Sequence, residues 1–141
     1  MTFKKPRYIK SKNDISLGNI PEILSEKIDY PVFCFRHLHS DCGIEQCLRA
    51  DNSFVKQFLK KIDLISKLSW YDIQFSDRRG HGTEKIPRSA IRKSVPSSIT
   101  ADVKDFLSFY FNGDRGRIIG YRNQFLFHIV FIDTDLEVYN H

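Results

Sequence analysis

The chain has 141 residues, with 22 Lys or Arg against 17 Asp or Glu, a formal net charge of +5. This length suits one domain with its own core, and a hydrophobic fraction of 41% with 12 Phe excludes a wholly disordered chain. The N-terminus lacks the apolar core of a signal peptide, and no segment approaches a membrane span. Three cysteines are typical of free thiols in a reducing compartment. The composition therefore predicts a soluble, cytoplasmic protein with an anionic partner and no membrane contact.

In chain order, a basic N-terminal arm over residues 1–30 precedes one domain over residues 31–141. A short helix is expected after Pro21, and the alternating segment Pro31–His39 predicts a strand. Asp51 is expected to cap an amphipathic helix that runs to about residue 68. Its apolar stripe consists of Phe54, Phe58, Ile62, Ile65 and Leu68.

The middle of the chain is predicted from composition more than from periodicity. Trp70–Phe75 is rich in β-forming residues, which favours a second strand. Residues 76–100 are expected to form a long basic loop with one short element at Ser89–Lys93. Val103–Asn112 has an aromatic density that favours a strand, although its polar start also allows a helical turn. A turn is expected at Asn112–Asp114.

Two β-rich runs, residues 117–122 and 125–133, flank the polar pair Asn123-Gln124 and predict an antiparallel hairpin. The order β, α, β, basic loop, β, β, β then predicts an α+β domain. We expect a twisted, mostly antiparallel sheet with one or two helices packed on one face.

The basic segment 78–93 holds six Lys or Arg against one acid, Glu84. The positive field around Glu84 favours its ionised form, which makes it a candidate proton acceptor. His81 lies between Gly80 and Gly82, whose backbone freedom allows close approach to a ligand. The alternative is a solvated loop in which Glu84 only pairs with its neighbours. The six basic residues are Arg78, Arg79, Lys85, Arg88, Arg92 and Lys93.

The closing hairpin and the segment after it add groups suited to phosphate chemistry. Arginine binds phosphate through a fixed fork of donors, while Tyr139 and His141 can transfer protons. RNA cleavage needs a base for the 2′-hydroxyl, a clamp for the phosphate and an acid for the leaving 5′-oxygen. Candidate clamp residues are Arg115, Arg117 and Arg122.

Two geometric expectations follow for a ribonuclease site. Arg88 should join Arg117 and Arg122 in one basic concavity. Glu84 or His81 should meet Tyr139 or His141 across the sheet as a base–acid pair.

Five cysteines and histidines lie close together early in the domain: Cys34, His37, His39, Cys42 and Cys47. Zinc accepts these ligand types, but the spacing matches no standard zinc site. Cys34 and His37 would also lie on opposite faces of a regular strand. Buried cysteines beside a strand end are the preferred interpretation, and neither a metal nor a cofactor is expected.

Two further features are interpreted as core. Alternation places His128 on one face with Leu126, Val130 and Ile132, which favours a core histidine over a catalytic one. The aromatic run between residues 106 and 111 could stack on bases but is more often core.

The stretches His81–Ile91, Ile99–Phe111 and Gly120–Tyr139 resemble those of a group of short bacterial proteins, over residues 31–141. The order of elements and the close Tyr121-Arg…Phe-His-Ile-Val-Phe-Ile-Asp…Val-Tyr139 are similar to the RelE/ParE-like toxins of bacterial toxin–antitoxin modules. This resemblance implies a RelE-like fold and a metal-independent endoribonuclease, an mRNA interferase that cleaves mRNA, usually in the ribosomal A site. RNA and a cognate antitoxin would be its partners.

The resemblance also implies roles for individual residues. Glu84 would be the base, and Tyr139 or His141 would take the C-terminal role. Arg115, Arg117 or Arg122 would clamp the phosphate. The chain departs from the family in its long loop with His81 and in residues 1–30.

Two alternative functions remain open. The first is a non-catalytic nucleic-acid-binding module that uses the 78–93 patch, whose binding would survive loss of Glu84 and His141. The second is a ParE-like toxin that inhibits a protein target such as gyrase.

Overall fold

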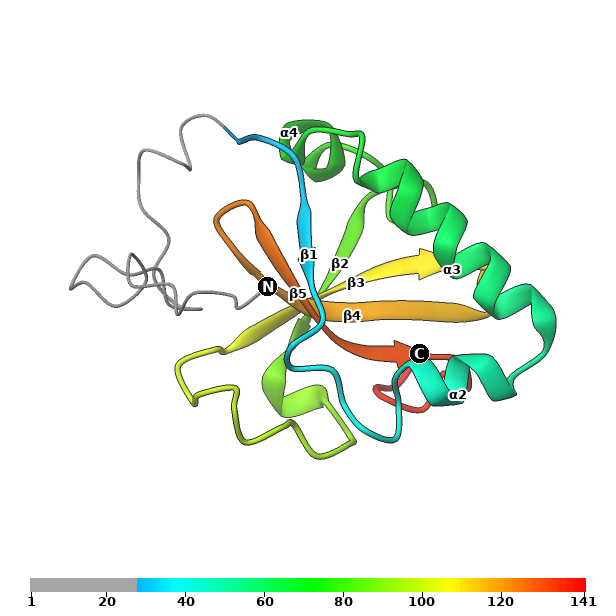
Figure 1. Ribbon diagram of the computed structural model, residues 1–141. Helices are drawn as coiled ribbons and strands as arrows, with labels where there is room; N and C mark the ends of the chain where they lie inside the picture. The colour runs from blue at the N-terminus through cyan, green and yellow to red at the C-terminus, as the bar shows by residue number, and fades with distance from the viewer. Residues whose placement is uncertain (1–27) are drawn as a thin grey trace, which may run out of the picture.

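The computed structural model describes residues 28–141, which form an α+β domain around a five-stranded mixed sheet (Figure 1). The sheet order is β1-β5-β4-β3-β2. The strands are β1 (Val32–Cys34), β2 (Thr83–Pro87), β3 (Asp105–Phe111), β4 (Gly116–Asn123) and β5 (Leu126–Asp133). The helices are α2 (Ile44–Arg49), α3 (Asn52–Ile65) and α4 (Trp70–Gln74), with a 3₁₀ turn η2 (Arg88–Ala90). The α+β class is as predicted.

Most of the basic arm and the helix expected after Pro21 lie outside the described residues. Within residues 28–141, no helix combines the length and the apolar character needed to cross a membrane.

Strands β2 to β5 pair antiparallel in sequence order, whereas β1 pairs with β5 in parallel. The predicted hairpin is confirmed as β4 and β5, and its connection contains Gln124 at φ 58°. The predicted turn after β3 has positive φ at Asn112 and Gly113, which are residue types that tolerate this conformation. The sheet is therefore mostly antiparallel, with one parallel edge.

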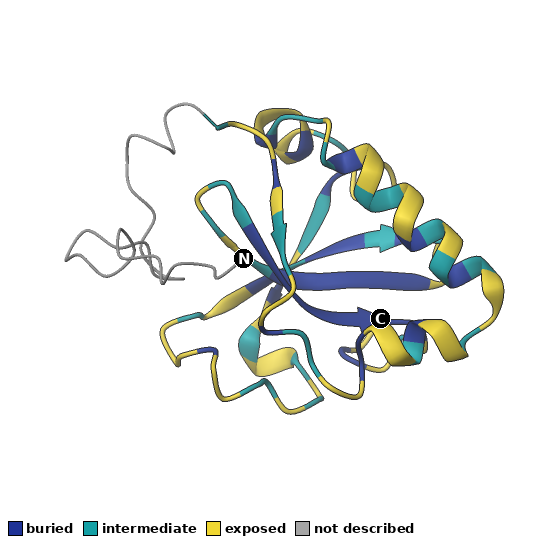
Figure 2. Cartoon of the chain, in the orientation of Figure 1, coloured by how far each residue is buried: buried dark blue, intermediate teal, exposed yellow. Residues whose placement is uncertain are grey.

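One face of the sheet is covered by the three helices, which Figure 1 shows along one side of the strands. Helix α3 begins after Asp51, whose carboxylate accepts from the backbone N–H of Ser53 at 2.9 Å. Its predicted stripe is confirmed, because Phe54, Phe58 and Ile65 are buried against the sheet. Figure 2 shows the alternation of buried and exposed positions along this helix.

The opposite face is covered by the segment between η2 and β3 and by the segment after β5. Their side chains Ile99 and Val138 pack with Phe106, Ile119 and Phe131 of the sheet. Strand β5 consequently has both faces buried, and every residue from 127 to 132 is 0% exposed.

Three predictions about elements were wrong. Trp70–Phe75 is not a strand: helix α4 begins after Ser69, whose hydroxyl accepts from the Asp72 N–H at 2.9 Å. The strand expected over Pro31–His39 extends only over Val32–Cys34. The expected long loop contains β2, an edge strand paired with β3.

The expected face of Ile132 is also corrected. Ile119 pairs with Phe131 and Gly120 with Ile129, so Val130 is an extra residue that shifts the alternation. As a result, Ile132 lies on the helix face, while Val130 and Phe131 both pack on the opposite face.

His128 lies in the core, as expected, but its ring makes no hydrogen bond to any residue that the structure describes. The residue is 0% exposed, its ring stacks on that of Tyr121 at 4.5 Å between centroids, and neither ring nitrogen has a partner within residues 28–141. Burial, with the nearby His37 contributing, lowers the pKa of His128 to about 4.

This buried imidazole predicts acid destabilisation. Above pH 6.5 both the folded and unfolded states hold His128 neutral, so it carries no penalty. Between pH 6.5 and about 4 only the unfolded state takes up the proton, which lowers the free energy of unfolding by about 3 kcal/mol in total. Urea denaturation from pH 7.5 to 4 should show this loss, and His128→Leu should lack it. Equal pH dependence in the two proteins would contradict this account.

Candidate functional site

The segment after β5 is folded back over the sheet by a single carboxylate. Asp133, only 2% exposed, accepts from the backbone N–H groups of Asp135 (3.2 Å), Glu137 (3.2 Å) and Val138 (3.0 Å). Leu136, at φ 58°, completes the reversal. The backbone carbonyl of Val138 then accepts from the Arg92 N–H at 2.6 Å. These contacts carry residue 139 onto the face opposite the helices.

There, Tyr139 meets Glu84 of β2 and Ser108 of β3. The Tyr139 hydroxyl lies 3.0 Å from Glu84 Oε1 and 3.0 Å from Ser108 Oγ. Because a phenol has one proton, donation to Glu84 leaves it able to accept from the Ser108 hydroxyl. Glu84 and Ser108 are cross-strand partners on the same face. Burial, and to a lesser degree the Glu84 carboxylate, raise the pKa of Tyr139 to about 12, while Ser108 and Arg117 act against this shift.

Glu84 has two further partners. The Tyr110 hydroxyl donates to the same Oε1 at 3.3 Å, and the Arg78 guanidinium lies 3.4 Å from Oε2. The side chain of Glu84 keeps 26% exposure and that of Arg78 51%. The hydroxyls of Tyr139 and Tyr110 therefore fix the orientation of the Glu84 carboxylate, which remains partly accessible to solvent.

Arg117 of β4 lies beneath this group. Its guanidinium carbon is 3.6 Å from the centre of the Tyr110 ring, and Nη1 donates to the carbonyls of Asp114 and Gly116 at 3.0 Å each. The residue is only 5% exposed, and its Nε has no hydrogen-bond partner among the described residues. In this position, Arg117 supplies fixed positive charge and cannot clamp a phosphate directly.

His141 forms the exposed side of the cluster. Its ring lies 4.3 Å from that of Tyr139, between centroids. Burial and then the Arg117 charge lower the pKa of His141, against the opposing pull of Asp133 and Glu84. A histidine with a lowered pKa gives up its proton readily when it is protonated, which suits a proton donor on the acidic side of neutral pH.

The structure thus brings together five predicted residues: Glu84, Tyr139 and His141, with Arg78 and Arg117 beside them. Sequence reasoning missed two members of this site, because Tyr110 was assigned to the core run and Ser108 was not considered. The alternation of β3 could have separated them from Phe109 and Phe111, which face the helices.

His81 does not join this cluster. Its Nδ1 lies 3.5 Å from Lys61 Nζ of α3, and its backbone N–H donates to the Ser76 hydroxyl at 3.1 Å. Burial, followed by the Lys61 charge, lowers its pKa. Of the two loop candidates for the base, only Glu84 therefore meets Tyr139.

The expected concavity of Arg88, Arg117 and Arg122 is not formed. Arg88 donates to the backbone carbonyls of residues 99, 100 and 103 and so holds the covering segment in place. Arg122 lies over the Trp70 ring at 4.2 Å and donates to the Gln124 carbonyl at 2.6 Å.

The other predicted phosphate ligands are distributed over the surface. Arg115 pairs with Asp51 at 2.6 Å, Arg79 with Asp114 at 3.5 Å, and Lys85 with Asp105 at 3.6 Å. Arg92 donates to the Asn140 side chain at 2.9 Å, near the cluster. Lys93 lies near the Cys42 thiol.

The early cysteines and histidines do not converge. Cys42 belongs to the core on one face of the sheet and Cys47 to the core on the other. His37 Nδ1 bonds the Ser98 hydroxyl at 2.7 Å, and His39 Nδ1 accepts from the Cys42 N–H at 3.1 Å. Within residues 28–141 there is no group of three His, Cys, Asp or Glu side chains that could hold a metal ion.

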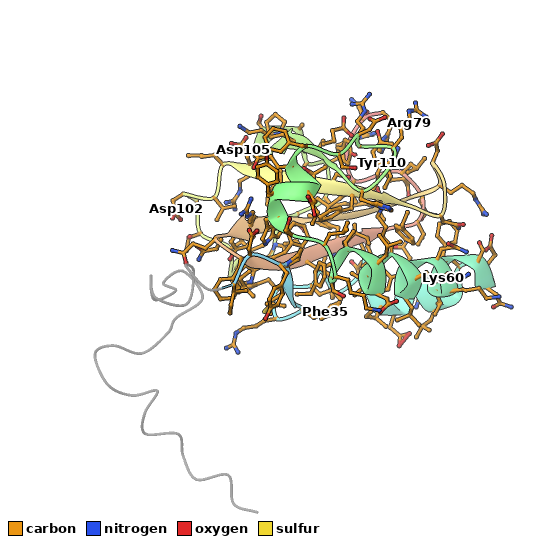
Figure 3. All side chains as sticks on the ribbon, turned by 90° about the horizontal axis from the view of Figure 1, so that it is seen from above. Phe35, Lys60, Arg79, Asp102, Asp105 and Tyr110 are labelled. Carbon is orange, nitrogen blue, oxygen red and sulfur yellow. The ribbon has the colours of Figure 1, made fainter. Side chains whose placement is uncertain are left out.

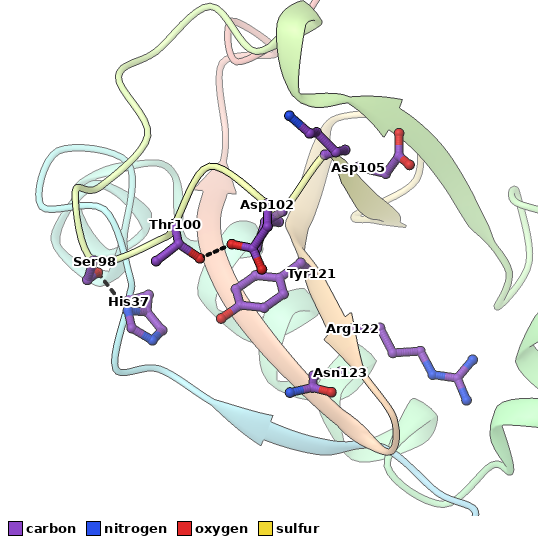
Figure 4. Close-up of a pocket in the computed structure, with 10 residues that line it drawn as sticks. His37, Ser98, Thr100, Asp102, Asp105, Tyr121, Arg122 and Asn123 are labelled. Carbon is purple, nitrogen blue, oxygen red and sulfur yellow. Dashed lines mark hydrogen bonds between the residues drawn. The ribbon is translucent and has the colours of Figure 1, made fainter. Parts of the chain in front are cut away.

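A hollow of about 580 Å³ lies elsewhere, between the 98–105 segment and the β4–β5 hairpin (Figure 4). His37, Asp102 and Tyr121 line it, with charges of both signs and no member of the Glu84 cluster. Figure 4 shows Tyr121 at its centre and the Arg122 side chain extending away from it. Its mixed lining favours no single ligand class, whereas the Glu84 cluster has a defined acid–base chemistry.

No protein family model matches the chain, and neither the curated proteins nor the solved structures contain a significant match. The RelE/ParE-like resemblance therefore stays a prediction.

The Asp133 turn yields a prediction about the site. Asp133→Ala removes the carboxylate that accepts three backbone hydrogen bonds, and we expect the free energy of unfolding to fall by at least about 2 kcal/mol. Tyr139 should leave Glu84, so its pKa should fall from about 12 toward the ordinary 10. Urea denaturation and pH titration of ¹³C-labelled tyrosine would measure these two effects. The exposed Asp135→Ala is the matched control, and an unchanged Tyr139 titration in Asp133→Ala would contradict the proposed role of the turn.

Proposed function

We propose that the protein is a metal-independent endoribonuclease of RelE-like type, the toxin of a type II toxin–antitoxin module. One observation carries the proposal: the Glu84 carboxylate, hydrogen-bonded by Tyr139 at 3.0 Å, is partly exposed and paired with Arg78, and His141 packs on the same Tyr139. A proton acceptor, a cation and a proton-transfer group are the three parts that RNA cleavage needs.

The order of elements supports the fold part of the proposal. An initial strand, helices and an antiparallel run of strands follow one another, and the last strand returns beside the first. The resemblance to RelE/ParE-like toxins rests on this order and on the residues of β4 and β5.

The proposed reaction assigns one role to each exposed group. Glu84 accepts the proton of the 2′-hydroxyl as the 2′-oxygen attacks the adjacent phosphorus. Arg78 binds the phosphate oxygens, and the fixed charge of Arg117 favours the negative charge that develops there. His141 donates a proton to the leaving 5′-oxygen. The products are a 2′,3′-cyclic phosphate and a 5′-hydroxyl, with no added water.

The buried groups position the reacting ones. Tyr139, Tyr110 and Ser108 fix the orientation of the carboxylate, so they affect cleavage through Glu84. In the cell, messenger RNA, free or on the ribosome, would be the substrate, and a cognate antitoxin would bind and inhibit the protein.

Glu84→Gln tests the base. The amide keeps the size of the side chain but cannot accept the proton, so cleavage of an RNA oligonucleotide should fall by about 10²–10⁴-fold. The assay contains EDTA, and the products are identified by their end groups. Glu45→Gln, on the exposed side of α2, is the matched control and should cleave like wild type.

The same variants distinguish the alternatives. Growth arrest on expression that persists in Glu84→Gln, with RNA intact in wild type, would replace the ribonuclease by a toxin that inhibits a protein target. If wild type binds RNA but causes neither cleavage nor growth arrest, the non-catalytic nucleic-acid-binding module becomes the favoured function.

The role proposed for His141 predicts how the rate of RNA cleavage depends on pH. As the proton donor it must be protonated, and its pKa is lowered by burial and by Arg117. The value of kcat/KM should therefore fall on the alkaline side, with a midpoint below the ordinary histidine pKa of 6.5. His141→Gln should lower the rate and remove this limb, as measured by initial rates from pH 4.5 to 9. An unchanged limb in His141→Gln would remove the residue from the reaction.

A further inference from the structure

A second hollow, of about 350 Å³, lies between α3, the turn that contains His81 and the β3–β4 connection. Its cationic side chains come from two elements: Lys60 and Lys61 from α3, and Arg79 from the turn. Among the described residues, no Asp or Glu lines it. Arg79 also pairs with Asp114, which lies outside the lining, at 3.5 Å, and both of these side chains are exposed, so an anionic ligand would compete with this carboxylate for Arg79. A concave surface lined by several cations and by no acid favours an anionic ligand.

The walls of this hollow are fixed by specific contacts. Lys61 Nζ donates to the Gly80 carbonyl at 2.7 Å, which joins the turn to the helix. A Cβ at Gly82 would lie 2.1 Å from the Ser76 carbonyl oxygen, so the path of the turn requires glycine there. The spacing of Lys60 and Lys61 with Leu64 places all three on one face of α3.

His81 has a defined donor orientation in this hollow. Lysine has donors only, so the contact from Lys61 Nζ makes His81 Nδ1 the acceptor and leaves the proton on Nε2. The Nε2–H group can then donate to an oxyanion. This gives the glycine-flanked histidine a binding role that does not require contact with Glu84.

Tyr110 connects the hollow to the Glu84 cluster. Its hydroxyl donates to Glu84 Oε1 at 3.3 Å, and the same residue lines the hollow. Arg79 and Tyr110 both line the hollow, and they are labelled on the same side of the molecule in Figure 3. A chain of phosphates that passes Glu84 can therefore continue past Tyr110 to the cations of the hollow.

We propose that this hollow is a second phosphate subsite, in which Lys60, Arg79 and His81 bind a backbone phosphate of single-stranded RNA that flanks the cleaved bond. The RNA identity of the ligand rests on the proposed function. Phosphate is favoured over an acidic peptide because Tyr110, which lines the hollow, also donates to Glu84 at the site proposed to bind the scissile phosphate.

Binding of an uncleavable single strand tests the subsite. A fluorescein-labelled all-2′-deoxy oligonucleotide of about ten nucleotides lacks the attacking hydroxyl and reports binding alone. Fluorescence anisotropy is measured at several salt concentrations for wild type and for Lys60→Gln/Arg79→Gln. Both side chains are exposed, so the fold should be retained, and circular dichroism checks this. The control is Lys56→Gln/Lys67→Gln, which removes the same charge from positions on and just after α3 that do not line the hollow.

We expect the hollow variant to bind about fivefold to tenfold more weakly at 0.1 M salt, and its log–log salt slope to fall by about 0.7, the value for one phosphate contact. The control should bind like wild type. Equal losses in the two variants, no loss in the hollow variant, or no binding by wild type would each overturn the subsite.

Failure of the ribonuclease proposal and failure of the subsite give different results in these experiments. If wild type does not cleave RNA but the hollow variant still binds the deoxy strand more weakly than the control, the ribonuclease proposal fails and the subsite stands. If wild type cleaves and both double variants bind alike, the subsite fails alone. An acidic protein as the true ligand would also leave oligonucleotide binding unchanged in the hollow variant, and so would overturn the proposal.

Discussion

The burial of both faces of β5 is the constraint on which the rest of the structure depends. Its residues from Phe127 to Ile132 are fully buried, and a strand of this kind needs a covering layer on each side of the sheet. The helices supply one layer. On the other side, within residues 28–141, the segment between η2 and β3 and the chain after β5 cover the strand, together with Cys42 of the loop after β1. The reversal at Asp133 is thus required by the core, and it carries Tyr139 to Glu84 at the same time. The burial of β5 therefore accounts both for the packing of this segment on the sheet and for the contact between Tyr139 and Glu84.

The sequence predicted the elements that have strong local signals. The hairpin of β4 and β5 and the capped helix α3 both combine a clear apolar pattern with a specific turn or cap. Trp70–Phe75 was misread because its β-forming residues outweighed the Ser69 cap, and a helix of five residues has little periodicity. Strand β2 was missed since it is an edge strand with one buried residue, Ile86.

The site was predictable in its residue types more than in its geometry. Glu84 was identifiable as the one acid in a basic segment, and Tyr139 and His141 as the proton-transfer groups near the closing strand. Their meeting depends on the Glu84–Ser108 register and the Asp133 turn, which involve residues distant in sequence. The roles of the arginines could not be predicted from the sequence, because a guanidinium can pack against other groups of the protein as well as bind phosphate. Arg88 binds backbone carbonyls, and Arg122 covers an indole ring.

The division of the cluster into a buried and an exposed layer favours catalysis over simple binding. A module that only binds phosphate needs exposed cations, and it gains nothing from a buried phenol. Burying Tyr139 and Arg117 costs free energy, which is offset only in part, since Arg117 Nε has no partner among the described residues. What this arrangement provides is a Glu84 carboxylate whose orientation is fixed by hydrogen bonds from Tyr139 and Tyr110. Fixed orientation contributes to reactions in which a proton must leave along one direction, and contributes little to affinity for a flexible polyanion.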